Sequence, residues 1–577
     1  MTLGRNLPHD TPLLRQHNYI TFDRFGKKRT TRTIVGPTLH QEGQNKHVFG
    51  KLDDSKPLWM LRSPPIGVYE LQLCQFGFVY KGDADVLLEP SLHFCYCRGM
   101  PHLPFLSHQN TGDLVLGRLW RFPISPLVRV SAPAHTAHMY VIGMSGKGKS
   151  KLLAYCLYQN IAAGRGCGLI DPHSLLVDDL LRLLVTRSVL TDPDIRSRLI
   201  YVDPARTDYV IPFNVLATQA EHPYDIAASV LKAFRRTWPE CLSEAPHFSN
   251  VVTAALIVLI ENGLTLMHMS RLLTNSEFRE QCLERVTDSS IVEFFHDRYD
   301  QWGREAPLLR ESTLNKIGAF SLNPRLKLML GQQTNHLDFR AIMDEGKILL
   351  LDLGHSDGET NRLIGSLVVT GLELAMRRRR NHKLWNLTID EFAGYVANEG
   401  SVKTLAHVFS EGRKFRTSMT VAHQDLSQLT PRMLGALSNV QTKVLFGIGR
   451  HDAEYFAKLI GRVDAEAVKR DPKTEAQHEL FSPLSEQWEQ WIDRLRFQPA
   501  RQATVASQDG RVVSLRTMNI PAYTATAEQV EEIRRESLAR YGIPYAEAER
   551  NAQETLADCQ PQRSMEIEIP AYEVVSL

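Results

Sequence analysis

The residues best suited to chemistry lie at positions 143–150, which read Gly-Met-Ser-Gly-Lys-Gly-Lys-Ser. This stretch fits G-x-x-x-x-G-K-[ST], the pattern of a phosphate-binding loop, in which glycines let backbone N–H groups curl around a polyphosphate. In that pattern Lys149 reaches the β- and γ-phosphates, and Ser150 is a ligand of Mg²⁺. The residues predicted to bind the nucleotide are Gly143, Met144, Ser145, Gly146, Lys147, Gly148, Lys149 and Ser150.

An acidic pair further along the chain is the expected partner of this loop. Asp390 and Glu391 directly follow the apolar segment Leu387–Ile389. Asp390 is predicted to bind Mg²⁺, directly or through water, and Glu391 to activate an attacking water. Taken alone, the pair fits equally well a helix N-cap followed by a first-turn acid. Lys149 and Ser150 upstream favour the catalytic interpretation, and the glutamate favours hydrolysis by water.

Three further polar residues are candidates for contact with the γ-phosphate. Gln424 comes just after the apolar segment Ser418–Ala422, so its amide could sense the γ-phosphate or the water. Arg413, on the preceding expected helix, could face a neighbouring subunit's nucleotide as an arginine finger. The simpler alternative for Arg413 is a solvated cation at a helix C-terminus. Arg450, just after the segment Lys443–Ile448, is a second candidate for the arginine finger.

The elements expected to hold these residues are short apolar strands that alternate with helices. Strands that are apolar throughout and joined by helices are typical of a parallel sheet covered on both faces. The sequence therefore predicts a nucleotide-binding α/β core. The expected strands are Met139–Ile142, Cys167–Ile170, Leu199–Val202, Lys347–Asp352, Leu387–Ile389, Ser418–Ala422 and Lys443–Ile448.

Changes in pattern along the chain predict five segments. The first is rich in proline, glycine, threonine and aromatic residues and has short alternating runs, which indicates a β-rich domain. An all-α insertion separates two parts of the sheet-forming core, and Asp509-Gly510 predicts a hairpin near the end of the second part. The last segment has a helix, Ala527–Tyr541, and a polar tail expected to be flexible. The predicted segments are 1–130, 131–222, 223–340, 341–525 and 526–577.

Composition narrows the class of protein. The 577 residues include 67 Lys and Arg against 65 Asp and Glu, so a polyanion would have to be met by a local basic surface. Eight irregularly spaced cysteines fit a reducing compartment, and the pair Cys95 and Cys97 lacks a second ligand pair at zinc spacing. The N-terminus has no apolar signal region, and the apolar run Val251–Ile260 is too short to span a bilayer. We expect a cytoplasmic protein without an integral membrane segment, at most peripheral at a membrane through a partner.

In their order along the chain, these motifs resemble those of conjugative coupling proteins of type IV secretion and of the related HerA/FtsK DNA-pumping ATPases. The similarity covers about 131–456 and rests on V-I-G-x-x-G-x-G-K-S, L-I-D-P-H, L-T-I-D-E-F, G-R-K and A-H-Q. The resemblance implies a RecA-like P-loop core with a helical insertion. It also implies a homo-hexameric ring with nucleotide between subunits, and ATP-driven movement of DNA through the central channel.

The resemblance also implies roles for individual residues. Membrane-bound relatives begin with transmembrane helices, which are missing here, so docking on a secretion channel would require a separate anchor. Ser174 stands where relatives commonly have glycine, and Asp171 is expected to be structural or a metal-shell residue. The implied site comprises Lys149 and Ser150 for ATP and Mg²⁺, Asp390 and Glu391 as the second acidic motif, Gln424 as sensor and Arg413 as arginine finger.

Sequence features for DNA binding are weaker than those for the nucleotide. The run Arg377–Arg380 could attract phosphates, yet it ends an expected helix, Leu363–Met376, where cations favour the C-terminal dipole. Lys232, Arg235 and Arg236 in the insertion are open to the same two interpretations. No sequence-reading module is evident, so any DNA contact is expected to use phosphates and to be independent of sequence.

Three functions from different classes remain open. The first is an ATP-hydrolysing DNA translocase, with a secretion-channel or relaxase-type protein as partner. The second is an ATPase that moves or remodels protein substrates in a secretion apparatus. The third is a nucleotide-gated scaffold with negligible turnover, against which the intact Glu391 and Gln424 argue.

Overall fold

The computed structural model forms two compact units, Met1–Pro101 and His102–Leu577. It describes six short strands before residue 93 and, after residue 112, the ranges 113–120, 126–217, 222–238, 246–301, 306–381, 383–395, 399–467 and 481–557. Cys95, Cys97 and the C-terminal tail lie outside the described residues. The strands of the first unit pair antiparallel: β1 (Arg15–Phe22) with β2 (Lys28–Val35), β3 (His40–Gln41) with β4 (Gln44–Asn45), and β5 (Phe78–Val79) with β6 (Ser91–Leu92).

An 11-stranded sheet forms the centre of the second unit, in the order β11-β13-β10-β14-β15-β9-β16-β17-β18-β7-β8. Neighbours from β11 to β16 are parallel, and the remaining neighbours are antiparallel. The predicted α/β fold with a mostly parallel sheet is thus confirmed. The parallel strands are β9 (Met139–Ile142), β10 (Gly166–Asp171), β11 (Leu199–Val202), β13 (Ile348–Asp352), β14 (Trp385–Ile389), β15 (Thr417–His423) and β16 (Thr442–Leu445).

The middle strands are apolar throughout because both faces of the sheet are covered. Every residue of β9, β10, β13, β14 and β15 is buried. A half-exposed strand would instead alternate apolar and polar residues. The helices of this core are α1 (Ala132–His135), α2 (Lys149–Ala162), α3 (Leu175–Thr186), α4 (Pro193–Ser197), α14 (Gly358–Met376), α15 (Glu399–Glu411), α16 (Pro431–Ser438), α17 (Arg450–Ile460) and α18 (Leu484–Arg496), with the turns η1 (Val189–Thr191), η5 (Phe392–Tyr395), η6 (Gly412–Phe415) and η7 (Leu426–Gln428).

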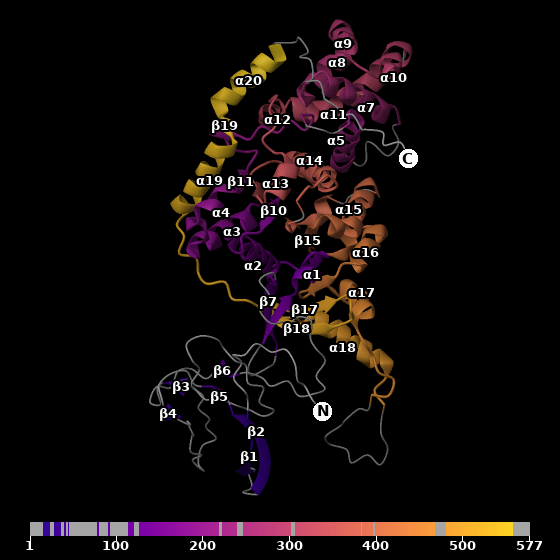
Figure 1. The fold of residues 1–577 in the computed structure, drawn as a ribbon. Coiled ribbons are helices and arrows are strands. Elements are labelled where there is room, and N and C mark those ends of the chain that lie inside the picture. The colour runs from indigo at the N-terminus through magenta and orange to yellow at the C-terminus, as the bar shows by residue number, and fades with distance from the viewer. Residues whose placement is uncertain are drawn as a thin grey trace, which may run out of the picture. The chain divides into compact units, whose positions relative to one another are not determined.

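A helical region lies between β12 (Tyr209–Val210) and β13. Figure 1 shows helices α7 to α11 gathered at one end of the sheet. The apolar run Val251–Ile260 falls within α7, which is a core helix of this region with most of its side chains buried. Across the described ranges, no helix combines the length and apolar character needed to cross a bilayer. The helices of the region are α5 (Pro223–Thr237), α7 (Pro246–Glu261), η2 (Leu266–His268), α8 (Met269–Thr274), α9 (Ser276–Leu283), α10 (Ser289–Glu293), η3 (Phe294–Tyr299), α11 (Ala306–Ser321), α12 (Pro324–Leu330) and α13 (Phe339–Asp344).

Antiparallel strands from both ends of the chain extend the sheet. The predicted hairpin is present as β17 (Gln502–Ser507) and β18 (Val512–Thr517). The next strand in the sheet, β7 (Leu114–Leu119), pairs with β18 and with β8 (Leu127–Val130). Strands from within the first 130 residues therefore belong to the same sheet as the phosphate-binding loop.

Helix α19 (Ala527–Tyr541) covers the opposite edge of the sheet, along β11. The hydroxyl of Ser537 accepts a hydrogen bond from Tyr201 N at 2.8 Å and donates one to Leu199 O at 2.8 Å. Arg196 adds a charged contact to α19, with Nε and Nη2 each 2.5 Å from a carboxylate oxygen of Glu536. The chain then continues through β19 (Ile543–Pro544), paired with β12, into α20 (Tyr545–Ala557).

Acid sensitivity is expected from a buried histidine in α1. His135 is 3% exposed, and among the residues that the structure describes neither ring nitrogen has a hydrogen-bond partner. Burial, with the charge of Arg165, lowers its pKa to about 4. The unfolded chain would take up a proton below about pH 6.5, whereas the folded chain would not until about pH 4. This site should therefore lower stability by about 1.4 kcal/mol per pH unit between those limits.

Replacing His135 by leucine should flatten the fall in melting temperature between pH 6.5 and 4.5. Thermal melts of both proteins across this range would check it. His296→Gln is the control, because His296 is exposed and pairs with Glu280. Equal slopes for His135→Leu and the unmodified protein would contradict the assignment.

Candidate nucleotide-binding site

The phosphate-binding loop joins β9 to α2 and needs its glycines for steric reasons. Gly146 and Gly148 have φ values of 74° and 109°, in the region where side-chain-bearing residues are strained. A Cβ atom on Gly143 would lie 2.5 Å from the Cβ atom of Phe446. Residues 144–146, at the tip of the loop, are exposed, which leaves the tip open to a phosphate.

Neighbouring turns anchor the loop on both sides. Met144 N donates to Gly447 O at 2.9 Å, and Arg501 N donates to Lys147 O at 2.9 Å. The Lys147 side chain leaves the loop and donates to Gln498 O at 3.0 Å. The loop is therefore held by the segments after β16 and before β17, although its own sequence shows neither contact.

Lys149 is buried beneath the loop and points back into it. Its Nζ donates to Gly143 O at 2.5 Å and to Met144 O at 3.3 Å. Burial lowers the pKa of the ammonium group, and the charges of Glu391 and Asp390 oppose this shift. The cation thus lies within the electrostatic reach of the acidic pair.

The acidic pair lies where β14 ends, with β15 between it and the loop strand β9. Ile389 of β14 is in register with Val421 of β15, and His423 of β15 is in register with Ile142 of β9. The three strands therefore end at one edge of the sheet. This strand order is that of RecA-like P-loop folds, in which one strand separates the loop strand from the strand of the acidic motif.

Asp390 is 8% exposed, and its environment disfavours ionisation of the carboxyl group. Burial raises its pKa to about 6; the charges of Asp171 and Glu391 act in the same direction. Two effects oppose the rise: a hydrogen bond of 3.0 Å from Glu391 N to Asp390 Oδ1, and the charge of Lys149. A bound cation would stabilise the ionised form of a carboxyl group in this setting. The hydroxyl group of Ser150, the last residue of the loop, is a second oxygen ligand of the kind that Mg²⁺ prefers.

Glu391 and Gln424 are in direct contact. Gln424 Nε2 donates to Glu391 Oε1 at 2.6 Å, which brings the predicted base and the predicted sensor together. Glu391 has a φ of 47°, an uncommon backbone conformation for a non-glycine residue. Strained residues of this kind concentrate at functional sites, because the surrounding structure must hold them.

The two finger candidates lie in different environments. Arg413 is in η6, before the amino end of β15, whereas Gln424 follows its carboxyl end. The seven residues of β15 span about 20 Å, so Arg413 cannot reach the loop of its own chain. Its side chain is exposed and has no ion pair within the described residues. Arg450, by contrast, pairs with Glu454 and Glu489, each at 2.8 Å.

Asp171 holds the turn that leads into α3. Its carboxylate accepts hydrogen bonds from the backbone N–H groups of His173, Leu176 and Val177, at 2.7 to 2.9 Å, and so caps α3. Ser174 in the same turn has a φ of 63°, a conformation that suits glycine. Its hydroxyl donates to a buried carboxylate, Asp352.

A second polar cluster, which the sequence analysis missed, follows β11 and β13. Asp203, Asp352 and His355 have ligand-type atoms within 4.8 Å of one another. Asp352 is fully buried, and the hydroxyl of Tyr201 donates to it at 2.9 Å. The sequence pattern that pointed to Asp390 also holds for this cluster, because both aspartates come at the end of an apolar strand.

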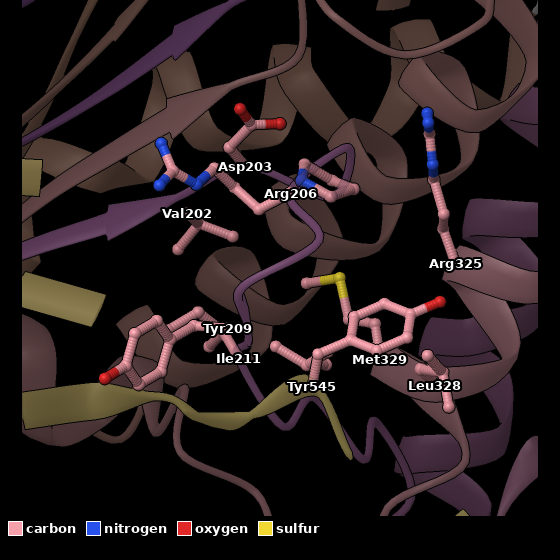
Figure 2. Close-up of a pocket in the computed structure, with 11 residues that line it drawn as sticks. Val202, Asp203, Arg206, Tyr209, Ile211, Arg325, Leu328, Met329 and Tyr545 are labelled. Carbon is pink, nitrogen blue, oxygen red and sulfur yellow. The ribbon is translucent and has the colours of Figure 1, made fainter. Parts of the chain in front are cut away.

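The pocket in Figure 2 is separate from the nucleotide site. It lies beside the end of β11, and no residue of the phosphate-binding loop or of the acidic pair lines it. Arg206, one of its two cations, already pairs with Asp208 and, at 2.8 Å, with Glu531. This pocket therefore lies apart from the residues predicted to bind the nucleotide. The labelled lining residues are Val202, Asp203, Arg206, Tyr209, Ile211, Arg325, Leu328, Met329 and Tyr545.

The fold and this edge of the sheet define the protein as a RecA-like P-loop protein. Residues 385–494 match a family model described as the TraM recognition site of TraD and TraG. The match covers about a fifth of the chain and confirms the resemblance to coupling proteins of the TraG/TraD type. A comparison with curated proteins gave no match.

Solved structures with similar chains include two of the conjugative coupling protein TrwB and one of VirB4. Unbound TrwBΔN70 is 17% identical, with 69% of this chain and 89% of that chain covered and a TM-score of 0.48. TrwB in complex with ADP and Mg²⁺ is 16% identical, with coverages of 69% and 88% and a TM-score of 0.46. VirB4 of Thermoanaerobacter pseudethanolicus is 14% identical, with coverages of 72% and 98% and a TM-score of 0.45.

Proposed function

We propose that this protein is a Mg²⁺-dependent ATPase that moves DNA as the coupling protein of a type IV secretion system. The observation that carries the proposal is the contact between Glu391 and Gln424 at the sheet edge that also holds Lys149. A glutamate beside a phosphate-binding loop, held by an amide, is suited to hydrolysis and not merely to nucleotide binding. The match of residues 385–494 to TraD and TraG supports the biological role.

Each residue has a distinct task in the proposed reaction. The backbone of the loop and the Lys149 ammonium group bind and orient the phosphates. Ser150 and Asp390 would hold Mg²⁺, which supplies charge neutralisation to the phosphates when it is bound. Glu391 takes the proton of the attacking water, and Gln424 orients that water and the carboxylate.

Arg413 is proposed to act in trans, as the arginine finger of a neighbouring subunit. Its position before the amino end of β15 places it far from the loop of its own chain, and its side chain is exposed. A finger of this kind stabilises charge on the transferred phosphoryl group. The proposal therefore includes a ring, with a homo-hexamer as the expected size, and the two ion pairs of Arg450 favour Arg413 for the role.

The DNA part of the proposal rests on the family match more than on the basic residues singled out from the sequence. Arg379 and Arg236 are buried and cannot meet a phosphate backbone. Arg377 pairs with Glu373, and Arg378 pairs with Asp225. We also propose that a protein partner binds the surface formed by residues 385–494, because the family description names a recognition site for TraM.

ATP turnover of the purified chain with no polymer, single-stranded DNA, duplex DNA and RNA would test the proposal. We expect stimulation by DNA of any sequence, and assembly in the presence of ATP that a mass measurement detects. Turnover stimulated by a secretion protein but not by DNA would instead favour the protein-moving ATPase. Nucleotide binding without single-turnover hydrolysis would contradict the motor function and favour a scaffold.

A further inference from the structure

Arg379 is a buried residue in a run that looks like a surface charge patch. Its side chain is 0% exposed, at the end of α14. Nε donates to Asp344 Oδ1 at 3.1 Å, and Nη2 donates to Met343 O at 3.1 Å and to Lys383 O at 2.7 Å. These bonds join the end of α14 to α13 and to the segment that enters β14.

The remaining donors of Arg379 bind the segment that enters β15. Nη1 lies 3.0 Å from Phe415 O, 3.1 Å from Arg416 O and 3.2 Å from the hydroxyl of Thr417. A guanidinium group has five N–H donors in a rigid plane, and all three nitrogens of this one are engaged. Arg379 therefore fixes η6 and the residues after it relative to the core.

The turn that Arg379 holds is strained. Arg416 has a φ of 53°, a conformation that a side-chain-bearing residue keeps only when its surroundings hold it. Its carbonyl accepts hydrogen bonds from both Arg379 Nη1 and Trp385 N, at 3.1 and 3.0 Å. Its own N–H donates to Arg413 O at 3.2 Å, which closes the turn on the finger candidate.

The contacts of Arg379 therefore determine the backbone from which Arg413 projects. The exposed Arg413 side chain has no partner within the described residues, so its direction depends on the turn beneath it. Burying a guanidinium group is costly unless its hydrogen bonds are satisfied, and an apolar side chain would fill the same interior more cheaply. The hydrogen bonds of this rigid fork to three separate segments are a task that an apolar side chain could not perform.

We infer that Arg379 is a positioning residue, which holds the η6 turn so that Arg413 can enter the nucleotide site of a neighbouring subunit. The inference rests on the proposed function. Arg379 touches neither nucleotide nor loop, and it acts only through Arg413. Nucleotide affinity should therefore be unchanged when Arg379 is replaced, whereas turnover should fall as it does for Arg413→Ala.

The test compares Arg379→Gln and Arg379→Lys with the control Arg380→Gln in the full chain. Arg380 is the next residue of the run, is exposed, and has no side-chain ion pair within the described residues. We expect turnover about 100-fold or more below normal for Arg379→Gln, partial recovery in Arg379→Lys and normal turnover in Arg380→Gln, since a finger contributes about 10³- to 10⁵-fold. Binding of a fluorescent ADP analogue should stay within about twofold in all three.

Mixing subunits separates positioning from a general loss of structure. Lys149→Ala subunits have no working loop but keep an intact Arg413. When they are mixed with Arg379→Gln subunits, each Arg379→Gln site beside a Lys149→Ala neighbour regains a well-placed finger. Turnover of the mixture should then exceed the sum of the two proteins assayed separately, which a merely destabilised Arg379→Gln subunit would not produce.

A parallel mixture of Arg413→Ala with Lys149→Ala distinguishes failure of the inference from failure of the proposed function. If this mixture regains turnover and the Arg379→Gln mixture does not, Arg379 is not a positioning residue. Normal turnover in Arg379→Gln alone would also overturn the inference. If neither mixture regains turnover, the finger in trans is wrong, and the role inferred for Arg379 is overturned with it.

Discussion

Lys149→Ala is expected to weaken ATP binding at least about 100-fold and to abolish measurable turnover. The ammonium group is held beneath the loop by Gly143 O and Met144 O, close to where the phosphates would lie. Its hydrogen bonds to phosphate oxygens would be charge-assisted, and each bond of this type contributes about 1.5 to 3 kcal/mol. The loss of two such hydrogen bonds costs about 3 kcal/mol or more of binding free energy, which corresponds to a fall in ATP affinity of at least about 100-fold.

Titration with a fluorescent ATP analogue, followed by phosphate release, would measure both effects. Lys151→Ala is the matched control, because this lysine lies in the same first turn of α2 but pairs with Asp179 at 2.7 Å. The control should bind ATP normally. If the Lys149→Ala protein binds ATP as well as the control does, the nucleotide does not bind at this loop. The proposed motor function would then be contradicted as well.

Glu391→Gln is expected to lower the turnover number about 10²- to 10⁴-fold while ATP binding is retained, the range typical for loss of a general base. The amide cannot accept a proton from water, although it has nearly the shape of the carboxylate. The contact with Gln424 at 2.6 Å also changes, because the donor then faces an amide in place of a charged acceptor. A single-turnover measurement with bound ATP would separate the chemical step from binding and release.

Two further variants sharpen the Glu391 experiment. Glu345→Gln is the control, because Glu345 is an exposed residue that pairs with Lys347 at 2.9 Å. Gln424→Ala, alone and combined with Glu391→Gln, tests whether the two residues act as a unit. If they do, the double variant should be little slower than Glu391→Gln alone. Fully multiplicative effects, or normal turnover in Glu391→Gln, would contradict the assigned roles.

The central strands and the loop could be predicted from sequence because their signals are local. A strand that is buried on both faces must be apolar throughout, and Gly148 must be glycine where φ is 109°. That the acidic pair and Gln424 lie at the same edge of the sheet could also be predicted, since parallel strands end at a common edge. Their contact of 2.6 Å could not, because it depends on side-chain conformations set by residues far away in the chain.

Long-range packing accounts for what the sequence did not reveal. The strand β7 pairs with β18, from the opposite end of the core, and nothing in the local pattern of either specifies the other. The role of Arg379 was hidden in the same way. Four successive arginines at the end of a helix indicate a solvated or phosphate-binding surface, whereas the acceptors of this one lie on three separate segments.

The hydroxyl group of Ser537 bears on how readily the protein aggregates. An outermost strand offers unpaired amide and carbonyl groups to any extended peptide, which is a route to aggregation. In β11, the N–H of Tyr201 and the carbonyl of Leu199 are already satisfied by one serine from α19. Truncation of the chain before residue 527 removes α19 and exposes these backbone groups of β11, so we expect the shortened chain to aggregate more readily.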